Sequence, residues 1–133
     1  RVQILQQNLF IAAPTLSQVA AIAALDERDY CEMQKAHYAE NRTLLSAGLR
    51  SLGIGVDEGD GAFYAYGDVS RFTNDSLSFC KDLLTTAGVA TTPGIDFDRV
   101  NGSRFVRFSY AGSKRTIETA LDRIAGYLAA RRA

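Results

Sequence analysis

The sequence has no tryptophan and is poor in the residues that build most metal and hydrolytic sites, with two cysteines and one histidine among 133 residues. A structural zinc site or a Ser-His-Asp triad needs several such side chains in a defined arrangement. No CxxC pair or Cys/His cluster occurs, so we expect no metal site and a packing or surface role for His37. The acidic turn with Asp57, Glu58 and Asp60 lacks the EF-hand pattern and is interpreted as a solvated loop.

Long apolar runs are also missing from the sequence. The N-terminal segment RVQILQQNLF lacks the apolar core of a signal peptide, and no window approaches the roughly 18 to 20 apolar residues of a membrane span. The cysteines, Cys31 and Cys80, fall far apart in segments with helical patterns. Unpaired packing thiols in a reducing compartment are therefore favoured over a disulfide. We predict a cytoplasmic protein with no membrane partner.

The sequence also has no excess of positive or negative charge, because 15 basic residues balance 15 acidic ones. No net field draws the chain to nucleic acid or to an anionic membrane, so we expect no nucleic-acid partner. The length requires only one hydrophobic core. The chain begins without methionine and in mid-pattern, which we interpret as the sign of a piece cut from something longer.

Apolar residues recur at helical intervals in four segments, and each segment has candidate boundary signals. The expected helices cover these ranges: 14–25, about 30–52, 76–87 and 114–130. Thr15 and Gln18 have the spacing of a capping box, and Ser113 is a candidate N-cap, as are residues 73–75. Gly53 and Gly88 are candidate helix stops.

Three other segments are rich in strand-forming residues: 62–68, the short stretch VATTPG that ends at Pro93 and Gly94, and 105–110. The residues between the last two, 95–103, are interpreted as a loop. This order of helices and strands predicts an α+β fold, with a small mixed sheet and helices packed on one face. Such an arrangement leaves the other sheet face for a partner domain or a ligand.

The stretch GSRFVRFSYAG places two arginines in or beside a strand. Side chains alternate between the faces of a strand, which predicts two sets: Val106, Phe108 and Tyr110 toward the core, and Phe105, Arg107 and Ser109 away from it. Arg107 is then held mid-strand on a rigid backbone, whereas Arg104 is expected to be solvated in the preceding loop. A guanidinium matches a carboxylate through two parallel hydrogen bonds, so Arg107 is the candidate anion-binding residue. An ordinary ion pair with one of the chain's own acids is the alternative.

Two tyrosines lie two positions apart in the expected strand 62–68. Tyr64 and Tyr66 are therefore expected to line the same sheet face. A stacking platform for single-stranded nucleic acid would need basic residues nearby, and this strand has none. We predict that both tyrosines pack in the core with hydrogen-bonded hydroxyl groups.

Four blocks occur in a recognisable order: PTLSQVAAIAAL (14–25), GAFYAYGDVS (61–70), GVATTPGIDF (88–97) and FVRFSYAG (105–112). Taken together they resemble the C-terminal portion of class I/II aminotransferases, the aspartate aminotransferase-like enzymes of fold type I that depend on pyridoxal phosphate. The resemblance covers residues from about 10 to 130. It implies that residues 29–133 form the small domain, and that residues 1–28 are a helical segment of the end of the large domain or of the interdomain region.

The resemblance also implies a role for one arginine. The motif FVRFSYAG looks like the family's vRlsfA, in which the arginine binds the α-carboxylate of the amino-acid substrate, and that arginine corresponds to Arg107. Arg104 has no role in the family pattern. Pro93 and Gly94, followed by Phe97, look like the family's turn before this strand.

Transamination further needs a lysine that forms a Schiff base with pyridoxal phosphate, and an acid beside the pyridine nitrogen. In the family both lie in the large domain. Lys35 and Lys81 fall in amphipathic helices and Lys114 follows the arginine strand, so none fits the role. The resemblance therefore implies that this chain contributes no catalytic or cofactor-binding residue and is inactive alone. The implied partners are an amino acid, a 2-oxo acid, the large domain and, at full length, a second copy in a homodimer.

Two alternatives to this interpretation stay open. One is a free-standing α+β module whose open sheet face binds a ligand or a partner protein. The other is the small domain of a different fold-type-I enzyme, such as a lyase, a synthase or a decarboxylase, because these enzymes can reuse the same small domain and carboxylate arginine.

Overall fold

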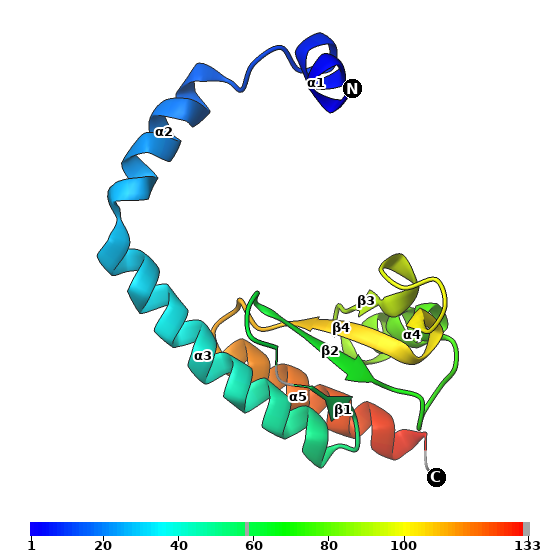
Figure 1. Ribbon diagram of the computed structural model, residues 1–133. Helices are drawn as coiled ribbons and strands as arrows, with labels where there is room; N and C mark the ends of the chain where they lie inside the picture. Colours follow the sequence, from blue (N-terminus) through cyan, green and yellow to red (C-terminus); the bar gives the residue numbers. More distant parts are fainter. Residues whose placement is uncertain (58, 132–133) are drawn as a thin grey trace. The chain divides into compact units, whose positions relative to one another are not determined.

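The computed structural model describes residues 1–57 and 59–131 (Figure 1). Glu58, from the expected acidic loop, lies outside the described residues. The chain divides into two compact units, Arg1–Lys35 and Ala36–Ala133. Helix α3, Arg28–Ser51, contributes its first turns to one unit and its remaining turns to the other.

The first unit is helical and has no buried residue. Besides the start of α3 it contains α1 (Val2–Leu9) and α2 (Thr15–Asp26). Helix α1 has no counterpart among the helices expected from the sequence, whereas α2 lies close to its expected range. The predicted capping box is wrong, because Thr15 is already the first helical residue and the cap position is Pro14. The Gln18 side-chain amide instead donates to the Ala13 carbonyl oxygen at 2.7 Å.

The second unit is built around a four-stranded sheet with the strand order β1-β2-β4-β3. Its strands are β1 (Gly55–Val56), β2 (Tyr64–Asp68), β3 (Thr92–Pro93) and β4 (Phe105–Ser109). The predicted α+β class is confirmed. The pairings found within the described residues are all antiparallel, however, where the sequence predicted a mixed sheet. Strands β2 and β3 do run in the same direction, but β4 lies between them and pairs with both.

Two further helices complete this unit: α4 (Ser76–Ala87) and α5 (Lys114–Ala130). Their caps are the ones predicted. The Asp75 carboxylate accepts a hydrogen bond from the Ser78 N–H at 3.0 Å, and the Ser113 hydroxyl oxygen accepts one from the Thr116 N–H at 3.1 Å. These contacts satisfy amide groups that have no partner within the helix. Helix α4 ends at Gly88, whose φ of 64° lies in the left-handed region that glycine adopts readily.

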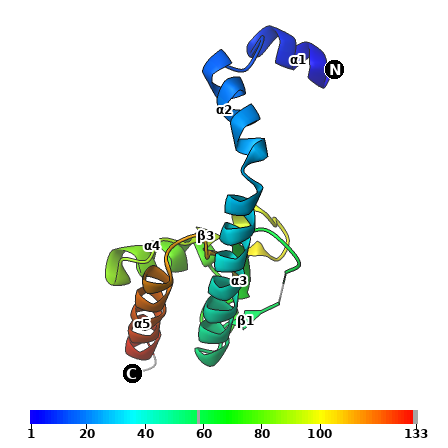
Figure 2. The ribbon, with the colours of Figure 1, turned by 90° about the vertical axis from the view of Figure 1, so that its left-hand side faces the viewer.

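The core lies on one side of the sheet. Figure 1 shows α5 and the second half of α3 on that side, and Figure 2 shows α4 and α5 together beside α3. The core combines side chains from the three helices and the sheet, including Leu49, Phe79, Leu83, Val106 and Ile124. Within residues 36–57 and 59–131, no helix layer covers the opposite sheet face, as the sequence predicts.

A buried amide ties α3 to the end of β4. The Asn41 side chain donates from Nδ2 to the carbonyl oxygens of Tyr110 at 3.0 Å and Gly112 at 2.8 Å. His37 lies half-buried one turn earlier, with its Nε2 atom 3.2 Å from the same Gly112 oxygen. His37 thus has a packing role, as expected from the sequence.

Both cysteines are unpaired, as predicted, but only one of them packs. Cys80 is buried in α4, where burial raises the pKa of its thiol. The Thr91 hydroxyl donates to its sulfur at 3.2 Å. Cys31 is exposed, so its predicted packing role is wrong; it belongs to the first unit, in which no side chain is buried.

Two glycines bring the ends of the segment between β3 and β4 into backbone contact. A Cβ added at Gly94 would lie 2.6 Å from the carbonyl oxygens of Gly102 and Phe105. A Cβ added at Gly102 would meet the backbone of Gly94 just as closely. A backbone cannot move aside as the end of a flexible side chain does, so the close approach requires glycine at both positions.

We predict that Gly102→Ala lowers the free energy of unfolding by about 1–3 kcal/mol, the usual cost of overpacking. Gly126→Ala is the matched control, because a Cβ at Gly126 would meet nothing within 4 Å inside α5 and alanine favours a helix interior by up to about 1 kcal/mol. Urea unfolding of the two variants beside the unsubstituted chain checks this. Equal stability of Gly102→Ala and the unsubstituted chain would contradict the steric argument.

Candidate functional site

The sheet face away from the helices carries the arginine singled out from the sequence. Alternate residues of β4 are buried, and the predicted facing of the strand is confirmed: Val106, Phe108 and the following Tyr110 inward, and Phe105, Arg107 and Ser109 outward. Arg104 is exposed just before the strand, also as predicted. The two arginines of this stretch therefore lie in different environments.

Strand β2 adds aromatic rings to the same face. Its small residues, Ala65 and Gly67, are buried on the core side, while Tyr64 and Tyr66 point away from it. The predicted core packing of the two tyrosines is wrong for a steric reason. A Cβ at Gly67 would lie 2.9 Å from the Phe108 ring, so the space beneath β2 admits only small side chains.

The guanidinium of Arg107 contacts two aromatic rings. Its central carbon lies 4.1 Å from the centroid of the Tyr64 ring and 4.4 Å from that of the Phe97 ring. Its Nη2 donates to the Thr92 hydroxyl at 3.3 Å. Across residues 1–57 and 59–131 no carboxylate forms an ion pair with Arg107. A guanidinium has five N–H donors, so hydrogen-bonding capacity is left for an anionic ligand.

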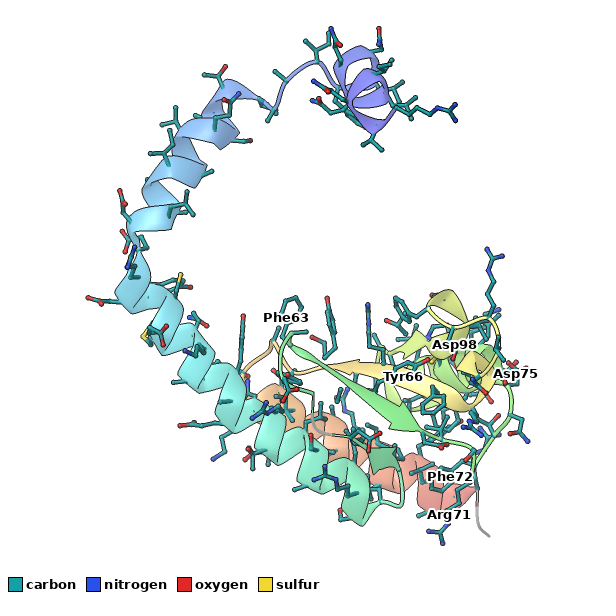
Figure 3. All side chains as sticks on the ribbon, in the orientation of Figure 1. Phe63, Tyr66, Arg71, Phe72, Asp75 and Asp98 are labelled. Atoms are coloured by element: carbon teal, nitrogen blue, oxygen red, sulfur yellow. The ribbon has the colours of Figure 1, made fainter. Side chains whose placement is uncertain are left out.

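Phe97 reaches Arg107 through the segment between β3 and β4, where the sequence predicts a loop. Two short 3-10 helices form there, Gly94–Asp96 and Gly102–Arg104. The N–H of Phe97 donates to the Gly94 carbonyl oxygen at 2.9 Å. The Asp98 carboxylate accepts from the N–H groups of Val100 at 2.8 Å and Asn101 at 3.0 Å. These backbone hydrogen bonds hold the pKa of Asp98 below its ordinary value. Figure 3 labels Asp98 in this segment.

Tyr66 supports the segment from the sheet. Its ring stacks on Phe105 with centroids 4.8 Å apart and planes within 5°. Its hydroxyl lies 3.5 Å from the Gly94 carbonyl oxygen, a long hydrogen bond (Figure 3 labels Tyr66). Partial burial, and next the negative charge of Asp98, raise the pKa of Tyr66 above its ordinary value. The Tyr66 phenol therefore keeps its proton to a higher pH than an ordinary tyrosine and can donate it to the Gly94 carbonyl oxygen.

Only some of the residues around Arg107 could be predicted from the sequence. Strand parity correctly placed Tyr64 and Tyr66 on the same face, but their aromatic character suggested the core face, and they lie on the open one. Thr92 faces Arg107 in the register of β3 and β4, which becomes known only once the strands are paired. Phe97 matched the turn of the resembling family, without an indication that its ring lies against the arginine.

The described residues hold no group of three or more His, Cys, Asp or Glu side chains arranged to bind a metal ion. Within the same residues, no helix is both long enough and apolar enough to cross a membrane. A pocket of about 570 Å³ lies on the helix side of the sheet, between α5 and residues 88–91, and does not include Arg107. The candidate site is therefore the open face around this arginine.

Comparison with known proteins identifies the family of the chain. The model of the family "Aminotransferase class I and II" matches residues 2–124. The chain belongs to this family. The resemblance inferred from four sequence blocks is thereby confirmed.

Individual aminotransferases support the assignment. The chain is 50% identical over 130 residues to valine–pyruvate aminotransferase of Mycobacterium tuberculosis, covering 96% of the chain and 34% of that protein. It is 36% identical over 118 residues to aspartate/prephenate aminotransferase of Thermus thermophilus, covering 86% of the chain and 30% of that protein. A crystal structure of an aminotransferase from Mycobacterium tuberculosis superposes with a TM-score of 0.87 at 48% identity, covering 97% of the chain and 34% of that structure.

The chain spans about a third of the length of these relatives. The relatives are thus matched over only part of their length, as the resemblance implied. None of these comparisons favours the alternative of a free-standing binding module, because the relatives are named as aminotransferases.

We predict that Asp98→Ala speeds hydrogen exchange at the amides of Val100 and Asn101, because both lose their acceptor. Acidification should also lower the protection of both amides, which compares their exchange rate with the intrinsic rate of an unstructured amide at the same pH. The pKa of Asp98 is lowered, so protection is full above the ordinary aspartate pKa and is lost as the pH falls through the lowered pKa. Exchange followed residue by residue by NMR is the measurement, at one fixed pH for the comparison of variants and at several pH values for the effect of acidification.

Asp96→Ala is the control for this experiment. Asp96 lies in the same segment and is exposed, and no side-chain hydrogen bond of its carboxylate is found in the described structure. Unchanged exchange at both amides in Asp98→Ala, or the same acceleration in Asp96→Ala, would show that the carboxylate of Asp98 does not hold the segment.

Proposed function

We propose that this chain is the C-terminal small domain of a pyridoxal-phosphate-dependent aminotransferase, which moves an amino group between an amino acid and a 2-oxo acid. In this proposal Arg107 binds the α-carboxylate that both substrates carry. The observation that supports it most strongly is a permanently charged side chain, mid-strand on the open sheet face, with no ion-pair partner among the described residues.

The chemistry of the ligand follows from the guanidinium. It is planar and always protonated, and it presents parallel N–H groups that match the two oxygens of a carboxylate. Thr92 accepts from Nη2 and the two rings contact the guanidinium, so its remaining N–H groups are available at the edge. A substrate carboxylate supplies the missing negative charge, and closure of the large domain over it would exclude water.

We propose the domain division that the resemblance implies, with residues 29–133 as the small domain and residues 1–28 at the end of the large domain or between the domains. The first helices support this, since α2 exposes apolar side chains: Leu16, Val19, Ile22 and Leu25. Such a surface needs a partner, and the large domain is the partner proposed. The contact-based division falls between Lys35 and Ala36, inside α3.

Pyridoxal phosphate is the proposed cofactor of the whole enzyme, because the family depends on it. When bound, it supplies the electron sink that lets an amino group leave one carbon skeleton and join another. The residues of this chain do not fit as its holder. Lys35 pairs with Glu32 at 2.9 Å in the first unit, and Lys81 and Lys114 are exposed on helices that pack on the opposite sheet face from Arg107. The cofactor lysine is therefore proposed to lie in the large domain.

A cytoplasmic location and a homodimer of the full-length enzyme are also proposed. The two unpaired cysteines support a reducing compartment. The dimer rests on similarity to the family, whose members usually form active sites from both subunits.

Arg107→Ala in the full-length enzyme should raise the KM for the amino acid and for the 2-oxo acid by about 30- to 150-fold, which corresponds to about 2–3 kcal/mol for a lost charge-assisted bidentate contact. Arg107→Lys should fall in between, because an ammonium keeps the charge but loses the fork. Steady-state kinetics with valine and pyruvate, the pair named for the 50% identical relative, is the first measurement.

Arg104→Ala is the matched control, since Arg104 is exposed three positions earlier and has the same charge. It should leave both KM values near those of the parent enzyme. A similar KM in Arg107→Ala and the parent enzyme would overturn the proposed carboxylate site.

The 133-residue chain alone should not catalyse transamination. Added to a mixture of pyridoxal phosphate and valine, it should change neither the absorbance spectrum nor the amount of 2-oxo acid relative to the same mixture without the chain, because its lysines are not placed to hold the cofactor. Absorbance spectroscopy with a coupled assay for the 2-oxo acid checks this. Stoichiometric and saturable appearance of either signal would contradict the prediction.

A further inference from the structure

We propose that Tyr64 and Phe97 are positioning residues that hold the guanidinium of Arg107 by contact with their rings and leave N–H groups free for the substrate carboxylate. This inference rests on the proposed function. It adds two side chains that act through the arginine rather than on the substrate. The ring of Tyr64 comes from β2, and the ring of Phe97 comes from the segment after β3.

Distance and exposure single out these two rings. The guanidinium carbon lies within 4.4 Å of both centroids, well inside the roughly 6 Å range of a cation–π contact. Tyr64 is 36% exposed and Phe97 is 54% exposed, so neither ring belongs to the hydrophobic core. Both therefore stay on the surface in contact with the same charged group.

The backbone around Phe97 is built to place its ring. Gly94 and Gly102 are in backbone contact, the Phe97 N–H donates to the Gly94 carbonyl oxygen, and Asp98 accepts two backbone hydrogen bonds. A segment held this firmly keeps an exposed ring in place, which an unstructured loop would not do.

Two ring contacts restrict the arginine side chain before a carboxylate binds. A long arginine side chain loses rotamer freedom when it binds a ligand, and prior ordering reduces that loss. The rings contact the guanidinium carbon from their aromatic faces, whereas a carboxylate is bound through the N–H groups. Thr92 accepts one of them at Nη2, which fixes rotation within the plane. The arginine is thus ordered before the substrate arrives.

The test replaces each ring in the full-length enzyme. Tyr64→Leu and Phe97→Leu should each weaken binding of propionate, a carboxylate probe without an amino group, by about two- to five-fold, measured as its inhibition constant. The KM values for an amino acid and a 2-oxo acid should rise by the same factor, with kcat nearly unchanged. Tyr64→Phe and Phe97→Tyr keep a ring and should retain parent-like values.

Substrates with different side chains distinguish positioning from direct contact. If the rings act through Arg107, the KM increase is the same for valine, aspartate and phenylalanine, because all three carry the same carboxylate. An increase that depends on the substrate side chain would mean that the rings touch the substrate, and it would overturn the inference.

A double-mutant cycle gives a second test that a purely structural role would not pass. In the Arg107→Ala background, replacing either ring should have no further effect on propionate binding, because the group that the rings position is absent. Undiminished effects of Tyr64→Leu and Phe97→Leu in that background would overturn the inference. Val100→Ala is the control in the same segment, since that side chain is 85% exposed.

The outcomes separate this inference from the proposed function. A parent-like inhibition constant in Arg107→Ala refutes the proposed carboxylate site and the inference with it. A large effect of Arg107→Ala with parent-like values in both leucine variants refutes only the role of the rings. Thermal unfolding of each variant identifies any that fails to fold, and for such a position a methionine variant, which also removes the ring, is measured instead.

Discussion

The charge of Arg107 determines which groups must surround it on the open sheet face. A guanidinium cannot be neutralised by losing its proton, so a half-buried one needs aromatic faces, hydrogen-bond acceptors or an anion around it. The described residues supply two rings and one hydroxyl, and no ion-pairing carboxylate. The side chain is ordered but electrostatically incomplete. That state suits a group whose anionic partner arrives as a substrate.

The two faces of the sheet are coupled through the size of a few side chains. Gly67 leaves room for the Phe108 ring on the core side, so the tyrosines of β2 point to the open face. The contact between Gly94 and Gly102 shapes the segment that carries Phe97 to the same face. The small residues at positions 67, 94 and 102 thus help to determine which groups surround Arg107.

Sequence reasoning was reliable where neighbouring residues decide the outcome. The strong alternation of β4 was enough to predict that Arg107 faces away from the helices. In β2, parity correctly grouped Tyr64 with Tyr66, but aromatic character suggested the core, whereas the small volume at Gly67 decides the facing. The ring of Phe97 could not be predicted beside Arg107, because its position depends on backbone contact between residues distant in sequence. The antiparallel pairing of the sheet could not be predicted for the same reason, because it depends on β4 lying between β2 and β3.

A structure of the full-length enzyme with a bound substrate analogue tests the central claim most directly. The account predicts that the analogue's α-carboxylate lies about 2.7–2.9 Å from two N–H nitrogens of Arg107, the usual length of a charge-assisted hydrogen bond. It also predicts that the rings of Tyr64 and Phe97 still contact the guanidinium. A carboxylate bound by a different residue, or an Arg107 paired with an acid of the large domain while the analogue is bound, would contradict it.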